Sequence, residues 1–242
     1  MAGPTYLQLA DGVANGLAAS VGMRVASEHE LAATHGVNRQ TARAALQELE
    51  RRFQVRRVRG AGTFASTRID YVVSPDLPPS VTATMRSAGV HPAIEVLSVR
   101  RTLSSAHVAE LLGIPARTPI VLVERRVLVG DVVASWSIAH LVAERVPCII
   151  RHVRSHTSLY ALLREEYGIE PGRRWSRASL EIPPAEVAQH LELTGRPPTW
   201  RLEGVNHDRH DHNRPIELTR SWMRADVVNV VFEMGSPPVV QR

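Results

Sequence analysis

The chain has 242 residues, of which 44% are hydrophobic and 22% are charged, with a formal net charge of +5 at pH 7. This length and apolar fraction are enough for one large domain, or for two smaller domains with hydrophobic cores of their own. The single cysteine, Cys148, excludes an intrachain disulfide. The sequence shows no secretory leader, and no apolar run approaches the roughly 18 residues of a membrane span. We therefore expect a cytoplasmic protein with no membrane partner.

Positive charge is concentrated in the first quarter of the chain. All 29 basic residues are arginine, and residues 1–68 carry a balance of +4 whereas the remaining residues carry +1. Five arginines lie between Arg51 and Arg59. Because arginine forks onto phosphate and guanine, this placement suits a surface that meets nucleic acid. A bias towards arginine codons explains the missing lysine equally well, so composition alone does not establish binding.

Two short helices and a tight turn are predicted near the start of the chain. Ser27 and Glu30 match the reciprocal capping pattern at a helix start, and the helix should run to about His35. Gly36 supplies the left-handed residue that ends it, and Asn38 is placed to cap the next helix. This spacing is typical of a helix-turn-helix. An earlier helix is predicted from an apolar stripe formed by Tyr6, Leu9, Val13 and Leu17.

The helix after Asn38 has two unlike faces. Its apolar face holds Ala42, Ala45, Leu46 and Leu49, and its opposite face holds Arg39, Gln40, Arg43 and Gln47. A face rich in arginine and glutamine is suited to reading base edges. After this helix, VRRV and TFAS flank RGAG, which predicts two short strands and a glycine-containing turn, a β-wing. Taken singly, each element could also be a solvated helix face or a basic loop with no partner.

The segment Ile69–Ser80 holds three prolines within five residues and is predicted to be a linker. It would join a first domain of residues 1–68 to a second domain of residues 81–242. In the second domain, strand patterns such as IVLVERRVLV alternate with helix patterns such as SLYALLREEYG, and a hairpin is predicted from Trp200 to Arg224. We therefore expect an α+β domain built around an antiparallel sheet.

The first domain resembles the winged helix-turn-helix of GntR-superfamily transcription regulators. The resemblance rests on ASEHELAATHGVNRQTARAALQELE followed by VRRVRGAGTF, with Asn38 for the usual serine and Ala42 for the usual valine. It implies that the third helix enters the major groove of double-stranded DNA and that the wing approaches the minor groove. The implied DNA contacts are His29, Arg39, Gln40, Thr41, Arg43, Arg57, Arg59, Gly60, Gly62 and Thr63.

The second domain resembles UTRA, the chorismate-lyase-like effector domain of the HutC-type branch. The resemblance rests on HVAELLGIPARTPIVLVERRVLVGDVVASWSIAHL, SLYALLREEYGI and NRPIELTRSWMRAD. It implies a homodimer and a small-molecule site on one face of the sheet, formed by strand arginines, a serine at a helix start and a carboxylate. The implied effector contacts are Arg125, Arg126, Ser158, Glu217 and Arg220.

The chemistry of the effector follows from the same residues. Ser158 begins a helix, and the free amides of a helix N-terminus attract an anion. Ala93 and Ile94 stand where sugar-phosphate binders of the family often carry serine or threonine. A small anion of the phosphate or phosphonate type is therefore favoured, with an amino-sugar phosphate or urocanate as the alternative.

Plainer interpretations of these residues stay open. Arg126 could pair with Glu124 or Asp131 on a solvated strand. Ser158 could serve only as a helix cap. Glu217 could be an ordinary surface carboxylate.

The stretch His207–Pro215, HDRHDHNRP, raises the question of a metal site. Imidazole and carboxylate ligands suit divalent ions, but the stretch falls at the tip of the predicted hairpin, where turn-forming residues gather. We expect no metal and no cofactor, and keep a metal-responsive DNA binder as the competing class. No nucleophile elbow, phosphate-binding glycine loop or nucleotide fingerprint is present, so neither catalytic residues nor an enzyme are predicted.

Taken with the resemblance, these features predict a transcription regulator that acts as a repressor. A homodimer would place two reading helices on a palindromic operator. An effector bound in the second domain would favour one arrangement of the DNA-binding heads over another.

Overall fold

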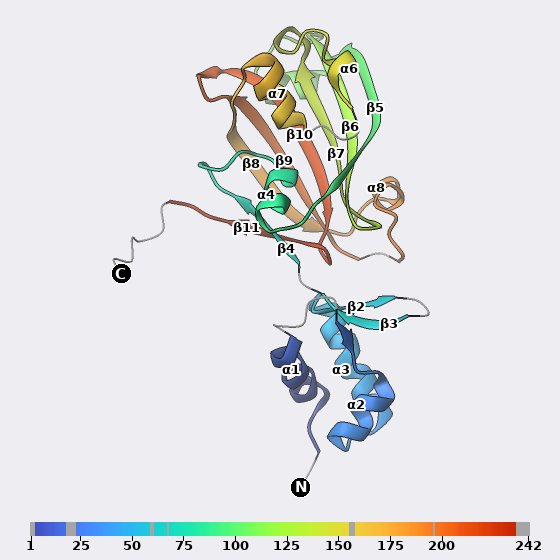
Figure 1. The fold of residues 1–242 in the computed structure, drawn as a ribbon. Helices are drawn as coiled ribbons and strands as arrows, with labels where there is room; N and C mark the ends of the chain where they lie inside the picture. Colours follow the sequence, from blue (N-terminus) through green and yellow to red (C-terminus); the bar gives the residue numbers. More distant parts are fainter. Residues whose placement is uncertain are drawn as a thin grey trace, which may run out of the picture. The chain divides into compact units, whose positions relative to one another are not determined.

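The computed structural model describes residues 3–17, 23–58, 61–66, 68–154, 158–195 and 197–235. The chain divides into two compact units, residues 1–68 and residues 69–242 (Figure 1). Each unit has hydrophobic clusters of its own, so each supplies its own core.

The first unit is the predicted winged helix-turn-helix. Three helices surround an apolar cluster that includes Leu31, Leu46 and Leu49. The small antiparallel sheet has the order β1-β3-β2, so the wing hairpin β2-β3 is extended by a third strand that the sequence did not suggest. The elements are α1 (Tyr6–Leu17), β1 (Arg24–Val25), α2 (Glu28–His35), α3 (Arg39–Arg51), β2 (Val55–Val58) and β3 (Gly62–Ala65).

Capping residues fix the helix-turn-helix as predicted. The backbone N–H of Ser27 donates to Glu30 Oε2 at 2.7 Å, and the N–H of Glu30 donates to Ser27 Oγ at 3.3 Å, which forms the capping box of α2. These bonds lower the pKa of the Glu30 carboxyl. Gly36 ends α2 in the left-handed region with φ of 61°, where glycine carries no Cβ penalty. Asn38 Oδ1 accepts the N–H of Thr41 at 2.8 Å and starts α3.

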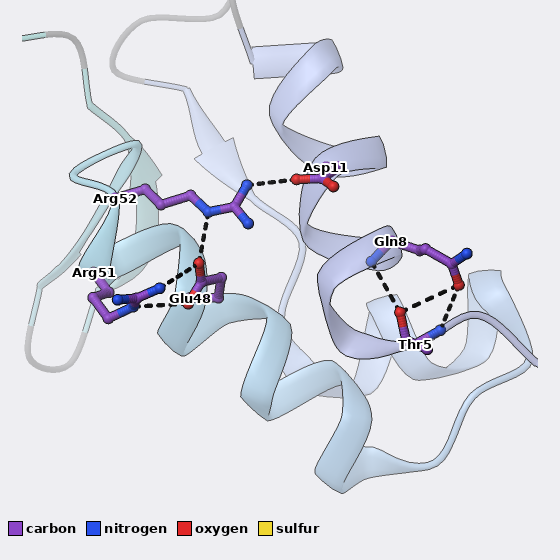
Figure 2. Close-up of polar contacts among 6 residues, drawn as sticks. All are labelled: Thr5, Gln8, Asp11, Glu48, Arg51 and Arg52. Atoms are coloured by element: carbon purple, nitrogen blue, oxygen red, sulfur yellow. Dashed lines mark hydrogen bonds and ion pairs between the residues drawn. The ribbon is translucent and has the colours of Figure 1, made fainter.

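The first helix is held by a cap of its own and by one buried face. Thr5 and Gln8 exchange backbone-to-side-chain hydrogen bonds of 2.9 and 3.3 Å at its start (Figure 2). Leu9 is buried, and Val13 packs against the same cluster. Tyr6, predicted as part of the apolar stripe, is 44% exposed and lies outside the buried face.

Two of the five arginines between Arg51 and Arg59 serve the fold of the first unit. Arg51 donates to both carboxylate oxygens of Glu48 at 2.8 Å, and Arg52 donates to Glu48 Oε1 at 2.7 Å and to Asp11 of α1 (Figure 2). Glu48 is 7% exposed, so this network ties the end of α3 to α1 at the edge of the core. These two arginines therefore bind carboxylates within the unit, whereas their clustering in the sequence had suggested a surface that faces phosphate.

The Glu48 network makes a pH-dependent prediction. Hydrogen bonds from Arg51 and Arg52 lower the pKa of Glu48 from 4.5 to about 2. A carboxyl with a lower pKa in the folded state stabilises the fold above its unfolded pKa, and this stability is lost as pH falls through the folded pKa. We expect Glu48→Gln to melt at a lower temperature than the wild type at pH 7, with a difference that shrinks between pH 4.5 and about 2.

Thermal unfolding of the full chain, followed by circular dichroism across this pH window, checks the prediction. Glu50→Gln is the matched control, because Glu50 lies on the same helix but its ion pair with Arg57 is exposed. A Glu48→Gln deficit that stays constant from neutral to acid pH would contradict the role of the carboxylate.

The second unit is an α+β fold around an antiparallel six-stranded sheet, as predicted, with strand order β5-β6-β7-β10-β9-β8. A second sheet pairs β4 with β11 in parallel. The strands are β4 (Ile69–Val73), β5 (Ala93–Leu103), β6 (Pro119–Val129), β7 (Val132–Val142), β8 (Pro171–Glu181), β9 (Thr199–Asp208), β10 (Asp211–Arg224) and β11 (Val228–Phe232). The helices are α4 (Val81–Ser87), α5 (Ala106–Leu112), η1 (Ala143–Arg145), α6 (Ile149–His152), α7 (Leu159–Tyr167) and α8 (Ala185–His190).

Both faces of the six-stranded sheet are covered. On one face, α6 and α7 pack over Val123 and Leu141, and α4 lies over the same face (Figure 1). On the opposite face, α5 packs over Leu218, and α8 packs over Trp136. Because successive strand residues point to opposite faces, neighbouring residues of one strand belong to different environments.

The predicted linker, Ile69–Ser80, contains ordered structure of the second unit. Its first five residues form β4, and their pairing with β11 runs from Ile69 opposite Val228 to Val73 opposite Phe232. Tyr71 is buried at 4% exposure. The prolines at the end of the segment predicted a linker, although its first residues form a strand. The partner strand lies about 160 residues later, and a pairing over that separation cannot be recognised from the local sequence.

Within the described ranges, no helix combines the length and the apolar character that crossing a membrane requires.

Candidate functional site

The first candidate site is the polar face of α3. The residues predicted to lie there are exposed, and the apolar residues on the other side of the helix are 0–2% exposed. The exposed set is Arg39, Gln40, Arg43 and Gln47. The predicted contact Thr41 is half-buried and donates its hydroxyl proton to Asn38 Oδ1 at 3.1 Å, which leaves its oxygen able to accept from DNA. His29 is exposed on α2.

In the absence of DNA, the arginines of this surface form weak ion pairs with neighbouring carboxylates. Arg43 Nε lies 4.0 Å from Glu28 Oε1, and Arg57 lies 3.9 Å from the same oxygen and 3.1 Å from Glu50 Oε2. All four side chains are at least 37% exposed. Exposed pairs of this kind contribute roughly 0–1 kcal/mol, so a phosphate or a base edge can take over these guanidinium groups at little cost.

The wing supplies the remaining predicted DNA contacts. Gly62 is exposed with φ of 115°, a conformation that residues with side chains rarely adopt, and Thr63 is half-buried. Arg56, on β2 beside Arg57, is exposed. Two predicted contacts, Arg59 and Gly60, lie outside the described residues.

The second candidate site is a cavity of about 60 Å³ in the second unit, on the sheet face covered by α4 and α7. Strands β6, β7, β10, β9 and β8 all contribute to its floor, and Pro79, the start of α4 and Ser158 also line it. Hydroxyl groups dominate the polar lining, which includes Ser80, Thr82, Ser135, Ser137, Ser158, Ser176, Thr219 and Ser221. Such a lining offers both donors and acceptors to a polar ligand.

Ser158, one of the predicted effector contacts, lines this cavity. It precedes α7, but its side chain makes no capping hydrogen bond. Its Oγ instead accepts from Thr82 Oγ1 at 3.3 Å, and Ser158 is 8% exposed. The interpretation of Ser158 as a helix cap only is therefore wrong.

Arg125 places a cation at the cavity. Its side chain is half-buried, its Nε is fully buried with no hydrogen-bond partner, and it forms no ion pair with the part of the chain that the structure describes. Burial lowers the pKa of the Arg125 guanidinium, and the nearby Tyr160 and Glu217 offset only part of this effect. A guanidinium whose buried Nε lacks a hydrogen-bond partner is costly, and an anion in the cavity would relieve that cost.

Glu217 is fully buried, at 0% exposure, so its interpretation as a surface carboxylate is wrong. Its Oε1 accepts from the Tyr160 hydroxyl and from Asn206 Nδ2, the latter at 2.6 Å. Burial and the neighbouring carboxylate raise the pKa of Tyr160 well above its usual value, which keeps the phenol protonated as a donor. Glu217 Oε2 is buried with no hydrogen-bond partner among the described residues, but Glu217 is not one of the residues that line the cavity, so the structure holds this predicted effector contact behind Tyr160 and Asn206.

The prediction that Arg126 and Arg220 contact the effector is corrected by the fold, because neither lines the cavity. Arg126 follows Arg125 on β6 and so points to the opposite face, where it binds Glu192 at 2.9 Å and lies 3.8 Å from Glu95. Arg220 likewise alternates with the cavity residues of β10 and donates to Glu203.

Close strand packing shapes the floor of the cavity at Gly204. A Cβ added there would lie 2.6 Å from the Trp175 carbonyl oxygen and 3.0 Å from Ser176 Oγ. We expect Gly204→Ala to lower the free energy of unfolding by about 1–3 kcal/mol, because the backbone of β8 would have to shift. Urea denaturation of the full chain measures this loss.

Gly172→Ala on the neighbouring β8 is the control for Gly204→Ala. The added Cβ would lie 2.8 Å from Arg209 Cγ, a side-chain atom that can move away. A larger loss for Gly172→Ala than for Gly204→Ala would contradict the backbone clash.

No group of three or more metal-ligating side chains is found among the residues that the structure describes. Of the histidine-rich stretch, His207 is buried at 8% exposure on β9 and His210 lies at the turn before β10. The side chain of His212 lies outside the description.

Several lining residues were not singled out from the sequence. Among them are Tyr71, Tyr160, Arg173 and Asn206. Tyr160 was within reach of sequence reasoning, because it follows Ser158 in the SLY motif. The others come from strands whose cavity-facing side depends on bulges and long-range pairing.

Family comparisons agree with the two units. Residues 7–65 match the bacterial regulatory proteins of the gntR family, and residues 87–229 match the UTRA domain. The two matches leave only short segments at the ends and between the units outside them.

Similar proteins span nearly the whole chain. The HTH-type transcriptional regulator GgaR of Escherichia coli (strain K12) is 30% identical over 237 residues, covering 95% of this chain and 91% of the relative. The probable transcriptional regulator PhnF of the same organism is 32% identical over 213 residues, covering 86% and 85%. The crystal structure of PhnF from Mycobacterium smegmatis gives a TM-score of 0.66 at 24% identity, covering 95% of this chain and 100% of that chain, which is a likeness of fold.

Proposed function

Because the chain belongs to the GntR family of bacterial regulators and carries a UTRA domain, we propose that it is a repressor controlled by a small anion bound in the cavity of its second unit. Its relatives are transcriptional regulators, so the chain is a transcription regulator and not an enzyme, as predicted. The repressor role, the anion and the cytoplasmic location are parts of the proposal.

The exposed face of α3 supports the DNA-binding half of the proposal. Arg39, Gln40 and Arg43 form one polar helix surface, and Arg57 on the wing hairpin shares Glu28 with Arg43. Arginine and glutamine supply the bidentate donors that read guanine and adenine in the major groove. A homodimer would present this surface twice, to half-sites about 10–10.5 base pairs apart or a multiple of that spacing.

The single observation that carries the effector assignment is Arg125. A guanidinium with a buried, unpartnered Nε, in a cavity lined by hydroxyl groups, is arranged for an oxyanion. Phosphate or a phosphonate is favoured because the cavity is small. An amino-sugar phosphate or urocanate stays the alternative, since the hydroxyl groups of the lining could accept from a hydroxyl or amine of such a ligand.

Selection of bound duplexes from a random-sequence DNA pool by the full chain tests the regulator. The expected product is an inverted repeat, bound with a steep dependence on salt. The selected duplex is then titrated with phosphate, methylphosphonate, glucosamine 6-phosphate and urocanate, and one of these anions is expected to weaken binding. Failure to enrich any sequence would overturn the DNA-binding role, and an unchanged affinity with every anion would overturn the effector assignment.

A further inference from the structure

Arg173 faces the cavity because β8 is bulged. It lies opposite Asn206 of β9, and Ser176 lies opposite Gly204, with a register shift between Arg173 and Trp175. Asn206 and Gly204 are two residues apart and share one face, whereas their partners on β8 are three residues apart. The extra residue therefore turns both Arg173 and Ser176 towards the cavity, while Trp175 packs in the apolar cluster beneath α5.

Within the described ranges, the hydrogen-bond partner of the Arg173 side chain is a neutral phenol. Arg173 Nη2 donates to the Tyr71 hydroxyl at 2.8 Å, and its Cζ lies 5.5 Å from the centre of the Tyr71 ring. Its Nε is buried with no hydrogen-bond partner, and the contacts of its side chain among the described residues are with Tyr71 and not with a carboxylate. A phenol is a weaker partner for a guanidinium than an oxyanion is.

The arrangement of the donors makes Tyr71 and an anion competitors. An oxyanion that binds a guanidinium side-on uses Nε together with Nη2, as the carboxylates of Glu48 and Asp226 do with Arg51 and Arg224 in this protein. In Arg173 that edge consists of the unpartnered Nε and of the Nη2 that Tyr71 occupies. An oxyanion on this edge would therefore compete with the Tyr71 hydroxyl for Nη2.

We propose that Arg173 is a second anion-binding residue of the cavity, and that the Tyr71 hydroxyl occupies the donor edge of Arg173 until an anion binds there. This inference rests on the proposed function and adds a means of transmission to it. Tyr71 belongs to β4, which begins at Ile69, directly after the last residue of the first unit. Binding of the anion breaks the hydrogen bond between Arg173 and Tyr71, which is one of the contacts that anchor β4. The segment leading to the DNA-binding unit is then released.

Calorimetric titration of the full chain with inorganic phosphate and with methylphosphonate tests the binding role. Arg173→Gln and Arg125→Gln are each expected to bind about tenfold more weakly than the wild type, because each loses a charge-assisted hydrogen bond. Tyr71→Phe keeps the ring but removes the competing hydroxyl, and is expected to bind about threefold or more tightly. A simple loss of folding would weaken binding in all three variants, so the opposite sign in Tyr71→Phe identifies competition.

Hydrogen exchange at the amides of residues 70–73 tests the release of β4. Phosphate is expected to speed exchange there in the wild type, and to change nothing in Tyr71→Phe, whose anchor is already absent. If Arg125→Gln loses phosphate while Arg173→Gln binds it like the wild type, the effector site stands and the role of Arg173 is overturned. If neither arginine matters, or if the wild type binds neither anion, the effector assignment falls together with it.

Discussion

Replacing Arg43 by alanine is expected to lower the affinity for the selected operator by about 10-fold to 100-fold or more, while affinity for unrelated DNA falls much less. Arg43 is exposed on the face of α3, and its ion pair with Glu28 is a long one of 4.0 Å. Its replacement therefore costs the fold little. A bidentate contact with a base contributes roughly 1–3 kcal/mol of discrimination, and a homodimer on a palindrome makes it twice.

Arg57→Ala gives the informative comparison. Arg57 lies on the wing hairpin, and a phosphate contact from it would add affinity without reading sequence. We expect affinity for operator and for unrelated duplex to fall together, with the slope of log affinity against log salt reduced by about one for each phosphate that is no longer neutralised. Fluorescence anisotropy with both duplexes at several salt concentrations separates the two behaviours.

Arg101→Ala is the matched control for both substitutions. Arg101 is exposed on β5 of the second unit, so its removal changes net charge equally without touching the proposed DNA surface. Wild-type affinity is expected for this variant. An Arg43→Ala protein that still separates operator from unrelated DNA as the wild type does would show that α3 is not the reading helix.

The second large effect is expected from Arg125→Gln, whose thermal stability relative to the wild type should depend on whether the anion is present. Without an anion, the variant should be as stable as the wild type or more stable, because it removes a half-buried guanidinium whose buried Nε lacks a hydrogen-bond partner among the described residues. With the anion, the variant should lose most of the thermal stabilisation. A ligand at 100 times its dissociation constant stabilises the folded state by about 2.7 kcal/mol, and weaker binding removes that gain.

Arg126→Gln supplies the control for Arg125→Gln on the same strand. It removes the same charge one residue along, but on the opposite face, where it breaks the ion pair with Glu192. Differential scanning fluorimetry with and without the selected anion should show a normal response in Arg126→Gln and none in Arg125→Gln. The reverse result would place the effector on the other face of the sheet.

These neighbouring arginines also show where sequence reasoning reaches its limit. In a sheet with one solvated face, alternation of apolar and polar residues tells which side is inside. Here both faces are covered, by α7 on one side and α8 on the other, so ERRV on β6 carries no such sign. Arg173 was harder still, because a bulge reverses the alternation along β8.

The first unit, by contrast, could be predicted almost completely. Its helix boundaries depend on local chemistry, namely the capping box at Ser27, the left-handed Gly36 and the cap at Asn38. Its polar and apolar faces follow from helical spacing alone. The short β1 was missed because a two-residue strand has too little pattern to detect.

The pairing of β4 with β11 changes where this protein could exchange modules with another in evolution. A recombination that joined a new DNA-binding unit before Ile69 would keep the pair intact. A crossover at residue 81, beyond the proline-rich segment, would delete Tyr71 and leave β11 as an unpaired edge open to aggregation. The boundary at which a DNA-binding unit can be exchanged is therefore narrow and lies between Arg68 and Ile69. The prolines that resemble a hinge in the sequence belong to the second unit and would stay with it.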